Sequence, residues 1–200
     1  VLGDLAVDND MAILADEIYL HYVYDDNEFV SIAGLSDEYK ERTLGIMSFS
    51  KTFSMTGWRL GYDIVPDRYL EEATKIRAMT APRPATFVFR AGISCLRGDF
   101  KYVEERCAEY KKRRNYFVKA VDDLGWPCHM FEGAFYAWFD VRGTGMGSVE
   151  FLDKLKESQN LRLSPGSRFG ADGFIRVPLV KPVPVLREAV KRLKAFKASL

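Results

Sequence analysis

The stretch SFSKTFSMTGWRLGY, residues 48–62, carries the most informative spacing in the chain. It follows directly on an apolar run, residues 44–47, and places Lys51 just after two serines. Arg59 comes eight positions after the lysine. An apolar run that ends in polar side chains is typical of a buried strand whose carboxyl end carries ligand-binding groups. We therefore expect a strand here, with the lysine and its polar neighbours at its end.

Two further short runs have the same organisation. Residues 11–15 are apolar and lead into Asp16 and, three positions later, Tyr19. Residues 59–65 form another run that stops at Pro66, which cannot extend a strand ladder. Together the three runs predict an open sheet with polar groups gathered where its strands end, which is how α/β folds build a ligand crevice.

The hydrophobic period becomes helical after this strand-rich part. Leu2, Leu5 and Ala6 also have helical spacing, but no capping residue precedes them, as if the sequence began partway through a helix. A break at APRPA, residues 81–85, separates the first two of the later helices. Helices are expected over residues 69–79, 85–96, 100–124, 148–158 and 184–198, and strands over residues 133–141, 161–164 and 174–180. The fold class predicted is α/β, with the long helix 100–124 joining two lobes.

The composition argues against partners bound by charge alone. The 200 residues hold 29 Lys and Arg against 28 Asp and Glu, a net charge of +1, so no field of one sign favours nucleic acid or an anionic membrane surface. No apolar run approaches the roughly 18 residues of a membrane span, and no signal peptide is recognisable, so we expect a cytoplasmic protein. Three irregularly spaced cysteines are expected to be reduced core thiols, without a disulfide frame or a metal site.

Three patterns in the sequence could suggest a binding or catalytic role, but we assign none to them. The basic run at residues 111–114 follows Glu109, which stands one helical turn before Arg113, so we expect a solvated helix face and no nucleic-acid contact. His21 and His129 fall on no catalytic motif and are expected at the surface or in packing. The aromatic residues within 135–139 alternate as in a strand and are expected in the core.

Two known motifs fit the lysine stretch incompletely. GIMSFSKT, residues 45–52, approaches the phosphate loop G-x-x-x-x-G-K-[ST], and ILADE, residues 13–17, looks like the magnesium-binding strand of the same nucleotide triphosphatases. However, Ser50 stands where the loop needs a glycine, and the acidic strand precedes the loop when it should follow. SFSK also satisfies the S-x-x-K of penicillin-binding enzymes, but the chain has neither K-T-G nor S-D-N.

A third interpretation uses more of the residues. Two hydroxyls and a guanidinium would hold a phosphate while a lysine amine condenses with an aldehyde. At ILADEIY, residues 13–19, followed by residues 48–62, the chain resembles the fold-type I, pyridoxal-phosphate (PLP)-dependent aminotransferases of class I/II. The likeness continues, in the right order, through EGAFY (132–136), SPGSRFG (164–170) and GFIR (173–176).

The resemblance implies a role for each matching residue. Lys51 would be the Schiff-base lysine, which also moves a proton between the substrate and the cofactor. Asp16 would pair with the pyridine nitrogen of PLP, and Tyr19 would hydrogen-bond the ring oxygen beside the aldehyde. Glu17 would point to the other side of the strand end. The PLP phosphate would be held by Ser48, Ser50 and Arg59.

Arg176 would bind the α-carboxylate of the substrate through two parallel hydrogen bonds. Pro178 follows two positions later and is acceptable only on an edge strand or at a strand end, so a structural arginine remains the alternative. Residues 89–90 also depart from the family, many of whose members carry a glutamine there. No metal is implied.

The resemblance covers all 200 residues but only the C-terminal half of the family's length. It implies that residues 1–100 belong to the large PLP-binding α/β/α domain and that residues 101–200 form a small α/β domain. The aromatic residue that stacks on the PLP ring and an asparagine that contacts the substrate carboxylate would precede Val1.

The function implied is transfer of an amino group from an amino acid, with aspartate or an aromatic amino acid as donor, to a 2-oxo acid by a ping-pong route in a homodimer. A PLP-dependent lyase of the same fold is one alternative. The other is an inactive fragment that binds PLP weakly or not at all, because it lacks the ring-stacking and carboxylate-binding residues and leaves sheet edges exposed.

Overall fold

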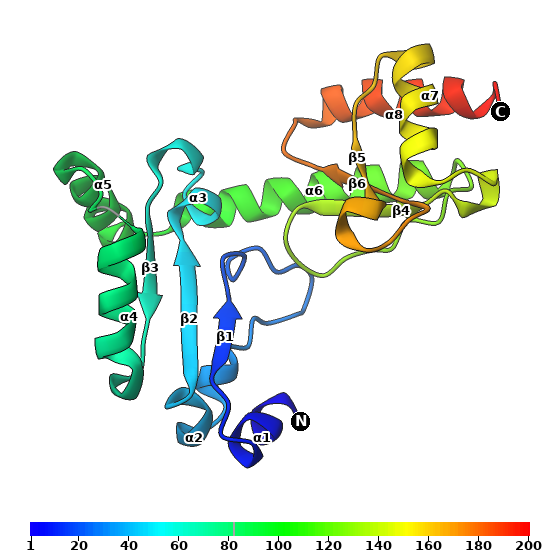
Figure 1. Cartoon of the computed structure of the whole chain (residues 1–200). Coiled ribbons are helices and arrows are strands. Elements are labelled where there is room, and N and C mark those ends of the chain that lie inside the picture. Colours follow the sequence, from blue (N-terminus) through cyan, green and yellow to red (C-terminus); the bar gives the residue numbers. More distant parts are fainter. Residues whose placement is uncertain (82) are drawn as a thin grey trace. The chain divides into compact units, whose positions relative to one another are not determined.

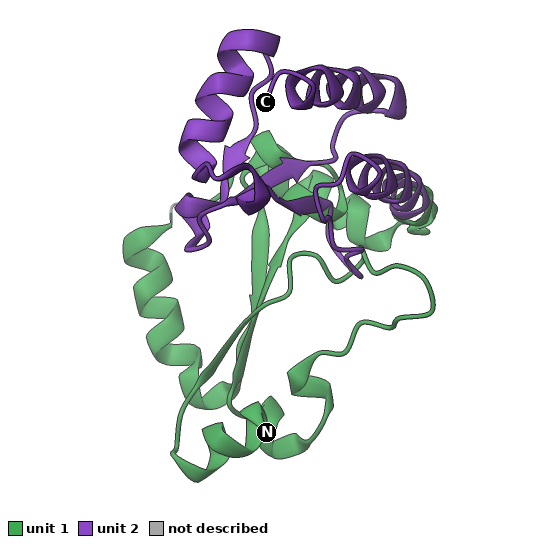
Figure 2. Cartoon of the chain, turned by 90° about the vertical axis from the view of Figure 1, so that its right-hand side faces the viewer, with its two compact units in different colours: residues 1–105 green, residues 106–200 purple. Residues whose placement is uncertain are grey.

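The computed structural model describes residues 1–81 and 83–200; Pro82, in the predicted break between two helices, lies outside the described residues. The chain forms two compact units, Val1–Glu105 and Arg106–Leu200, which Figure 2 colours separately. Their boundary falls inside the long helix α6 (Lys101–Asp122). Each unit combines a three-stranded sheet with helices, so the predicted α/β class is confirmed.

The first unit is built on a sheet with β2 (Thr43–Ser48) in its centre (Figure 1). β1 (Ile13–Asp16) pairs with β2 in parallel, and β3 (Gly61–Ile64) pairs with it antiparallel. The helices of this unit, besides the start of α6, are α1 (Leu2–Asp8), α2 (Asp37–Lys40), α3 (Phe49–Thr52), α4 (Asp67–Thr80) and α5 (Thr86–Arg97), with the 3-10 turns η1 (Ile32–Gly34) and η2 (Thr56–Trp58).

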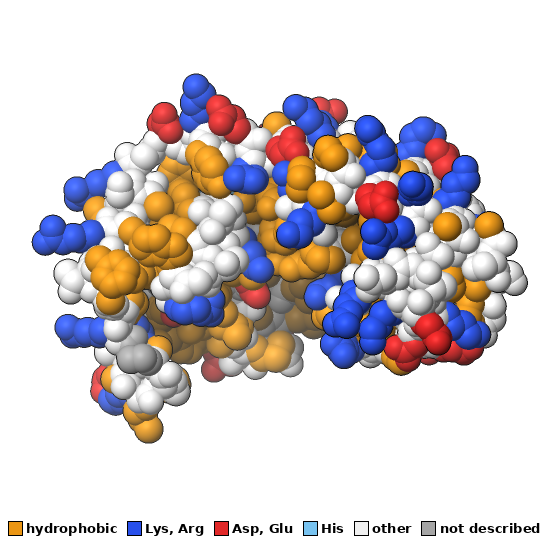
Figure 3. All heavy atoms as spheres, turned by 90° about the horizontal axis from the view of Figure 1, so that it is seen from above, with side chains coloured by type: hydrophobic (Ala, Val, Ile, Leu, Met, Phe, Trp, Pro, Cys, Tyr) orange, Lys and Arg blue, Asp and Glu red, His pale blue; other side chains and the backbone are white. Residues whose placement is uncertain are grey.

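The core of the first unit is small. Along β2, buried and half-buried residues alternate, as expected for a central strand. One buried cluster contains Phe49, Met55, Leu60 and Val88. Large apolar side chains elsewhere stay exposed, including Leu14 on β1 and Phe87 on α5, and hydrophobic side chains gather over α5 at the left of Figure 3. This unit therefore leaves much apolar surface uncovered.

The second unit has a larger core. Its antiparallel sheet has the order β4-β6-β5 and is packed with helices through a large buried cluster. Its elements after α6 are β4 (Tyr136–Asp140), η3 (Arg142–Thr144), α7 (Ser148–Gln159), β5 (Ser164–Pro165), η4 (Gly166–Phe169), β6 (Phe174–Pro178) and α8 (Val183–Lys197). Phe139, Phe151, Ile175 and Leu193 are all 0% exposed. Burying a side chain of this kind contributes roughly 1.5–3 kcal/mol, so this cluster is the main source of stability in the unit.

The prediction that residues 111–114 form a solvated helix face is wrong for Arg113 and Arg114. The Glu109–Arg113 pair is present at 2.9 Å, but Arg113 and Arg114 are buried. Arg113 donates to the carbonyl oxygens of Leu179 and Val180, and Arg114 donates to the carbonyl oxygen of Phe131 at 2.8 Å. The guanidinium groups are buried at little cost because backbone carbonyls accept their hydrogen bonds.

Two expectations about the second sheet are corrected. The strand predicted over residues 161–164 begins only at Ser164. On β4, Phe139 is buried, but Tyr136 and Trp138 are half-buried on the face that also carries Arg176, so this aromatic stripe is core on one side only. Pro178 is the last residue of β6, the central strand, so a strand end and not a sheet edge accommodates it.

The three cysteines form no disulfide within the described residues. Burial raises the pKa of the Cys128 thiol to about 11. This thiol therefore stays protonated at neutral pH, where a thiol is a poor nucleophile. None of the described helices is both long enough and apolar enough to cross a membrane.

We predict that Gly166→Ala destabilises the protein by about 1–3 kcal/mol. A Cβ at this position would meet the backbone carbonyl oxygens of Ala171 and Phe174, which cannot move without disturbing β6. Gly143→Ala is the matched control, because a Cβ there has no atom within 4 Å. Thermal or urea unfolding of the two variants measures the difference, and equal stabilities would contradict the steric argument.

Candidate active site

Strand pairing brings the ends of three segments to one edge of the first sheet. Asp16, the last residue of β1, is paired with Ile46, and Ser48, the last residue of β2, is paired with Gly61 at the start of β3. Because β3 is antiparallel, the segment that contains Arg59 arrives at the edge where β1 and β2 end. The register thus assembles residues that are distant in sequence, and sequence spacing alone suggests only part of this arrangement.

Lys51 lies on α3, a single helical turn that begins immediately after β2. The Ser48 side chain caps this turn, with its oxygen accepting a hydrogen bond from the backbone N–H of Ser50 at 3.1 Å. The lysine is half-buried, and its Nζ lies 5.7 Å from the centroid of the Tyr19 ring. The lysine and tyrosine predicted to share one site are therefore neighbours.

Tyr19 is placed by a turn that follows β1. The N–H of Glu17 donates to the carbonyl oxygen of Ile46, which extends the pairing with β2, and the N–H of Tyr22 then donates to the carbonyl oxygen of Tyr19. These bonds fold the chain back beside α3. The turn, and not the strand itself, brings the phenol to the lysine.

The two acidic residues at this edge have different surroundings. Asp16 is exposed, and its Oδ1 accepts a long 3.4 Å hydrogen bond from the N–H of Ile18. Glu17 is half-buried and accepts a 2.6 Å hydrogen bond from the hydroxyl of Ser31. The Glu17 carboxylate is thus engaged in a loop contact, whereas Asp16 keeps most of its acceptor capacity.

The sequence predicts that Arg59 begins a strand, but in the structure it does not. It has a left-handed backbone (φ 50°) at the end of η2, and β3 starts two residues later. Its guanidinium is exposed and donates one hydrogen bond, to the carbonyl oxygen of Thr56 at 3.0 Å. The turn aims the chain so that Leu60 enters the core while Arg59 stays at the surface.

Arg176 belongs to the second unit, on the outward face of β6. Its guanidinium carbon lies 3.8 Å from the centroid of the Phe169 ring and 4.5 Å from that of Tyr136. Its Nε is buried and has no hydrogen-bond partner within the described part of the chain. A buried donor without a partner is costly, and an anionic ligand would satisfy it.

Tyr22 is a residue at this site that the sequence analysis missed. It is 1% exposed, and its hydroxyl donates to the carbonyl oxygen of Lys51 at 2.8 Å. The bond ties the turn after β1 to the backbone of the lysine. His21, its neighbour in sequence, packs against Phe100 with ring centroids 5.4 Å apart, and burial lowers the pKa of the imidazole. The cluster of tyrosines at residues 19–24 is the sequence feature that could have pointed to Tyr22.

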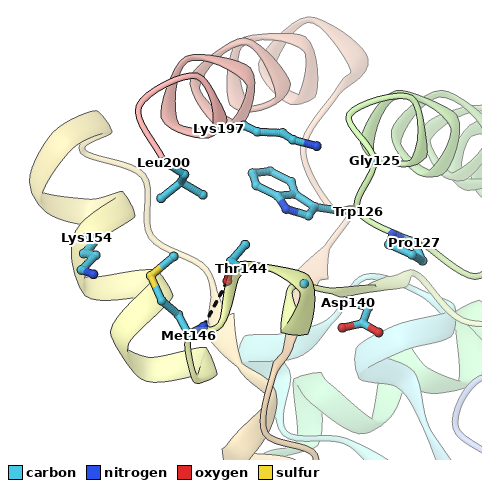
Figure 4. Close-up of a pocket in the computed structure, with 10 residues that line it drawn as sticks. Gly125, Trp126, Pro127, Asp140, Thr144, Met146, Lys154, Lys197 and Leu200 are labelled. Atoms are coloured by element: carbon cyan, nitrogen blue, oxygen red, sulfur yellow. Dashed lines mark hydrogen bonds between the residues drawn. The ribbon is translucent and has the colours of Figure 1, made fainter.

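A cavity of about 730 Å³ lies elsewhere, inside the second unit (Figure 4). Its charged side chains already have partners in the protein. Lys154 pairs with Glu150 at 2.8 Å, Asp140 pairs with Arg142 at 2.7 Å, and Lys197 donates to the backbone beside the Trp126 ring. None of the predicted site residues lines it. In residues 1–81 and 83–200, no group of three His, Cys, Asp or Glu side chains could hold a metal ion.

The sequence and the structure both match one family. The family described as aminotransferase class I and II matches residues 2–193. An aspartate aminotransferase of Pyrococcus abyssi is 36% identical over 197 residues, covering 96% of this chain and 50% of that protein. The aromatic-amino-acid aminotransferase 2 of Thermococcus litoralis is also 36% identical, with the same two coverages. The crystal structure of an aromatic aminotransferase from Pyrococcus horikoshii OT3 superposes with a TM-score of 0.94 at 35% identity, covering 99% of this chain and 54% of that one.

The chain therefore belongs to the class I and II aminotransferases, a family of enzymes, and the predicted family is confirmed. It spans about half the length of the curated relatives it matches. The roles assigned to single residues are not tested by these matches and stay predictions.

We predict that Tyr22→Phe lowers the free energy of unfolding by about 1 kcal/mol, because it removes a buried hydrogen bond to the carbonyl oxygen of Lys51. Tyr62→Phe is the control, since the Tyr62 side chain is exposed and its hydroxyl makes no hydrogen bond within the described residues. Urea unfolding measures both. A loss of stability in the control as large as that in Tyr22→Phe would count against the proposed anchor.

Proposed function

We propose that the protein to which this chain belongs transfers an amino group from an amino acid to a 2-oxo acid, with PLP as cofactor and Lys51 as the Schiff-base lysine. The observation that carries this proposal is the placement of Lys51 beside Tyr19 at a sheet edge that also bears Asp16 and Arg59. Aspartate or an aromatic amino acid is the proposed donor, because matched relatives are named as aspartate and aromatic-amino-acid aminotransferases.

The residues at the sheet edge fit a phosphorylated pyridine aldehyde. The Ser50 hydroxyl makes no hydrogen bond within the described residues, and Arg59 keeps most of its donors for a ligand. With the Ser48 hydroxyl, these groups would hold the phosphate through charge-assisted hydrogen bonds. Asp16 would pair with the ring nitrogen, and Tyr19 would donate to the ring oxygen. When bound, PLP would supply the electron sink that stabilises the carbanion of the substrate.

Lys51 would act on the substrate as an acid and base. Its amine would take the proton from the α-carbon of the amino acid and deliver it to the cofactor. The side chain is half-buried, and its Nζ lies 5.7 Å from the centroid of the Tyr19 ring, so the amine is held at the proposed cofactor site. The short α3 turn, held by Tyr22, would keep the amine in place during this transfer.

Arg176 would orient the substrate by binding its α-carboxylate. Its partnerless Nε supports this role, since a structural arginine would be expected to have partners such as those of Arg113 and Arg114. We further propose that residues 1–100 belong to the PLP-binding domain and residues 101–200 to a small domain, and that the full protein is a cytoplasmic homodimer. The exposed apolar side chains over α5 offer a surface that a second copy or other segments of the full protein would cover.

We predict that Lys51→Ala lowers the transamination rate of the natural full-length protein by about a thousandfold or more, since both cofactor attachment and proton transfer are lost. Lys40→Ala is the control, because that lysine is exposed on α2, which lies at the opposite end of β2 from α3 (Figure 1). The assay follows conversion of a 2-oxo acid to its amino acid. An undiminished rate in Lys51→Ala would refute the assignment of the lysine.

The 200-residue chain by itself is predicted to bind PLP weakly and to show no transamination. Its first unit has a small core and exposed strands, and it spans only half of its relatives. Absorbance titration of the purified chain with PLP measures this. A saturable, pH-dependent absorbance band that disappears in Lys51→Ala would show instead that the chain alone forms the cofactor site.

A further inference from the structure

Arg176 is held by aromatic rings without the polar partners that the buried Arg113 and Arg114 have. Strand register places Trp138 directly opposite it on β4, with Tyr136 two residues away on the same face. The Phe169 ring, at the end of η4, contacts Trp138 with centroids 6.1 Å apart and covers the guanidinium at 3.8 Å. The guanidinium is therefore surrounded by ring faces contributed by two separate elements.

A ring face holds a guanidinium without using its hydrogen-bond donors. The attraction acts between the cation and the π-electrons, while the N–H groups point outward in the guanidinium plane. No hydrogen bond or ion pair from the Arg176 side chain is present within residues 1–81 and 83–200, and its Nε is buried without a partner. Arg176 thus combines a restrained position with an unused set of donors.

Other arginines of the same unit are held by polar partners. Arg113 and Arg114 donate to backbone carbonyl oxygens, and their Nε groups donate to Glu109 and Asn115. Arg142 also lies over a ring, with 4.8 Å to the centroid of Phe174, but it forms a 2.7 Å ion pair with Asp140. These three side chains are fixed by polar partners and have fewer donors left for a ligand.

The loop that carries Phe169 is built to present the ring. η4 starts at Gly166, where a Cβ would meet backbone carbonyls, and is followed by Gly170 with a φ of 78°. Only glycine adopts that conformation readily. Phe169 remains 47% exposed, although a phenylalanine of this size would gain from burial. Its contact with Arg176 gives the exposed ring a function.

We propose that Phe169 and Tyr136 are positioning residues, which hold the Arg176 guanidinium flat against their rings so that its N–H edge is ready for a carboxylate. The inference rests on the proposed function and deepens it, because it names what sets the affinity for the substrate carboxylate. An arginine side chain loses much rotamer freedom when it binds a ligand. Rings that restrict the side chain beforehand reduce that loss and strengthen binding.

The test compares Phe169→Leu with Phe169→Tyr in the natural full-length protein with its cofactor bound. Leucine keeps apolar bulk but removes the π-face, whereas tyrosine keeps the ring. Calorimetric titration with succinate, a dicarboxylate probe that needs no turnover, gives the Kd, and steady-state assays give KM and kcat. We expect Phe169→Leu to raise the Kd for succinate and the KM for the amino acid roughly five- to tenfold with little change in kcat. Phe169→Tyr should stay within about twofold of the wild type.

Two controls define the scale. Arg176→Lys removes the planar guanidinium and should weaken succinate binding more than Phe169→Leu does. Phe29→Leu makes the same substitution at an exposed phenylalanine of the first unit and should leave the Kd unchanged. If Phe169→Leu does not fold, as judged by circular dichroism, Tyr136→Leu against Tyr136→Phe provides the same comparison at the second ring.

The outcomes separate this inference from the proposed function. Equal weakening by Phe169→Leu and Phe169→Tyr would mean that packing matters and the π-face does not, and would overturn the inference. So would a wild-type Kd in Phe169→Leu, or wild-type protein that does not bind succinate. The proposed function is decided separately by transamination in the wild type and its loss in Lys51→Ala.

Discussion

The pairing of β2 with its two neighbours is the constraint on which the candidate site depends. Parallel pairing with β1 places Asp16 near the end of β2, and antiparallel pairing with β3 returns the chain to the same edge just after Arg59. α3 begins where β2 ends, so Lys51 is presented at that edge by a single helical turn. A shift of one residue in either register would turn the alternate side chains to the opposite face and separate these groups.

Hydrogen bonds to backbone carbonyls complete what the register begins. The hydroxyl of Tyr22 reaches the carbonyl of Lys51, so the turn that carries Tyr19 and the turn that carries the lysine form one structure. In the second unit, Arg113 and Arg114 act in the same way on carbonyls of the chain. Arg176 is the exception, because aromatic rings hold it and its Nε has no hydrogen-bond partner within the described residues.

Much of the fold could be predicted because its elements have clear periods. Most of the main helices and strands follow from apolar runs and amphipathic spacing, and only their ends shift by a few residues, as with α7 and α8. The errors occur where local pattern and tertiary contact conflict. Arg59 was predicted to start a strand but occupies a left-handed turn. The basic run of α6 was predicted to be solvated, but Arg113 and Arg114 are buried and donate to carbonyl oxygens. The carbonyl groups that accept hydrogen bonds from Arg113 and Arg114 are distant from them in sequence.

The sequence by itself determined the family and the α/β class, because those depend on short motifs and on hydrophobic period. The residues that a phosphorylated aldehyde cofactor would require stay a prediction from the same motifs. Only the tertiary structure decided that Tyr22 anchors the backbone of Lys51, that Glu17 is engaged by Ser31, and that rings hold Arg176. These are contacts between segments far apart in the chain, and their existence depends on strand register and turn geometry, which spacing along one segment does not encode.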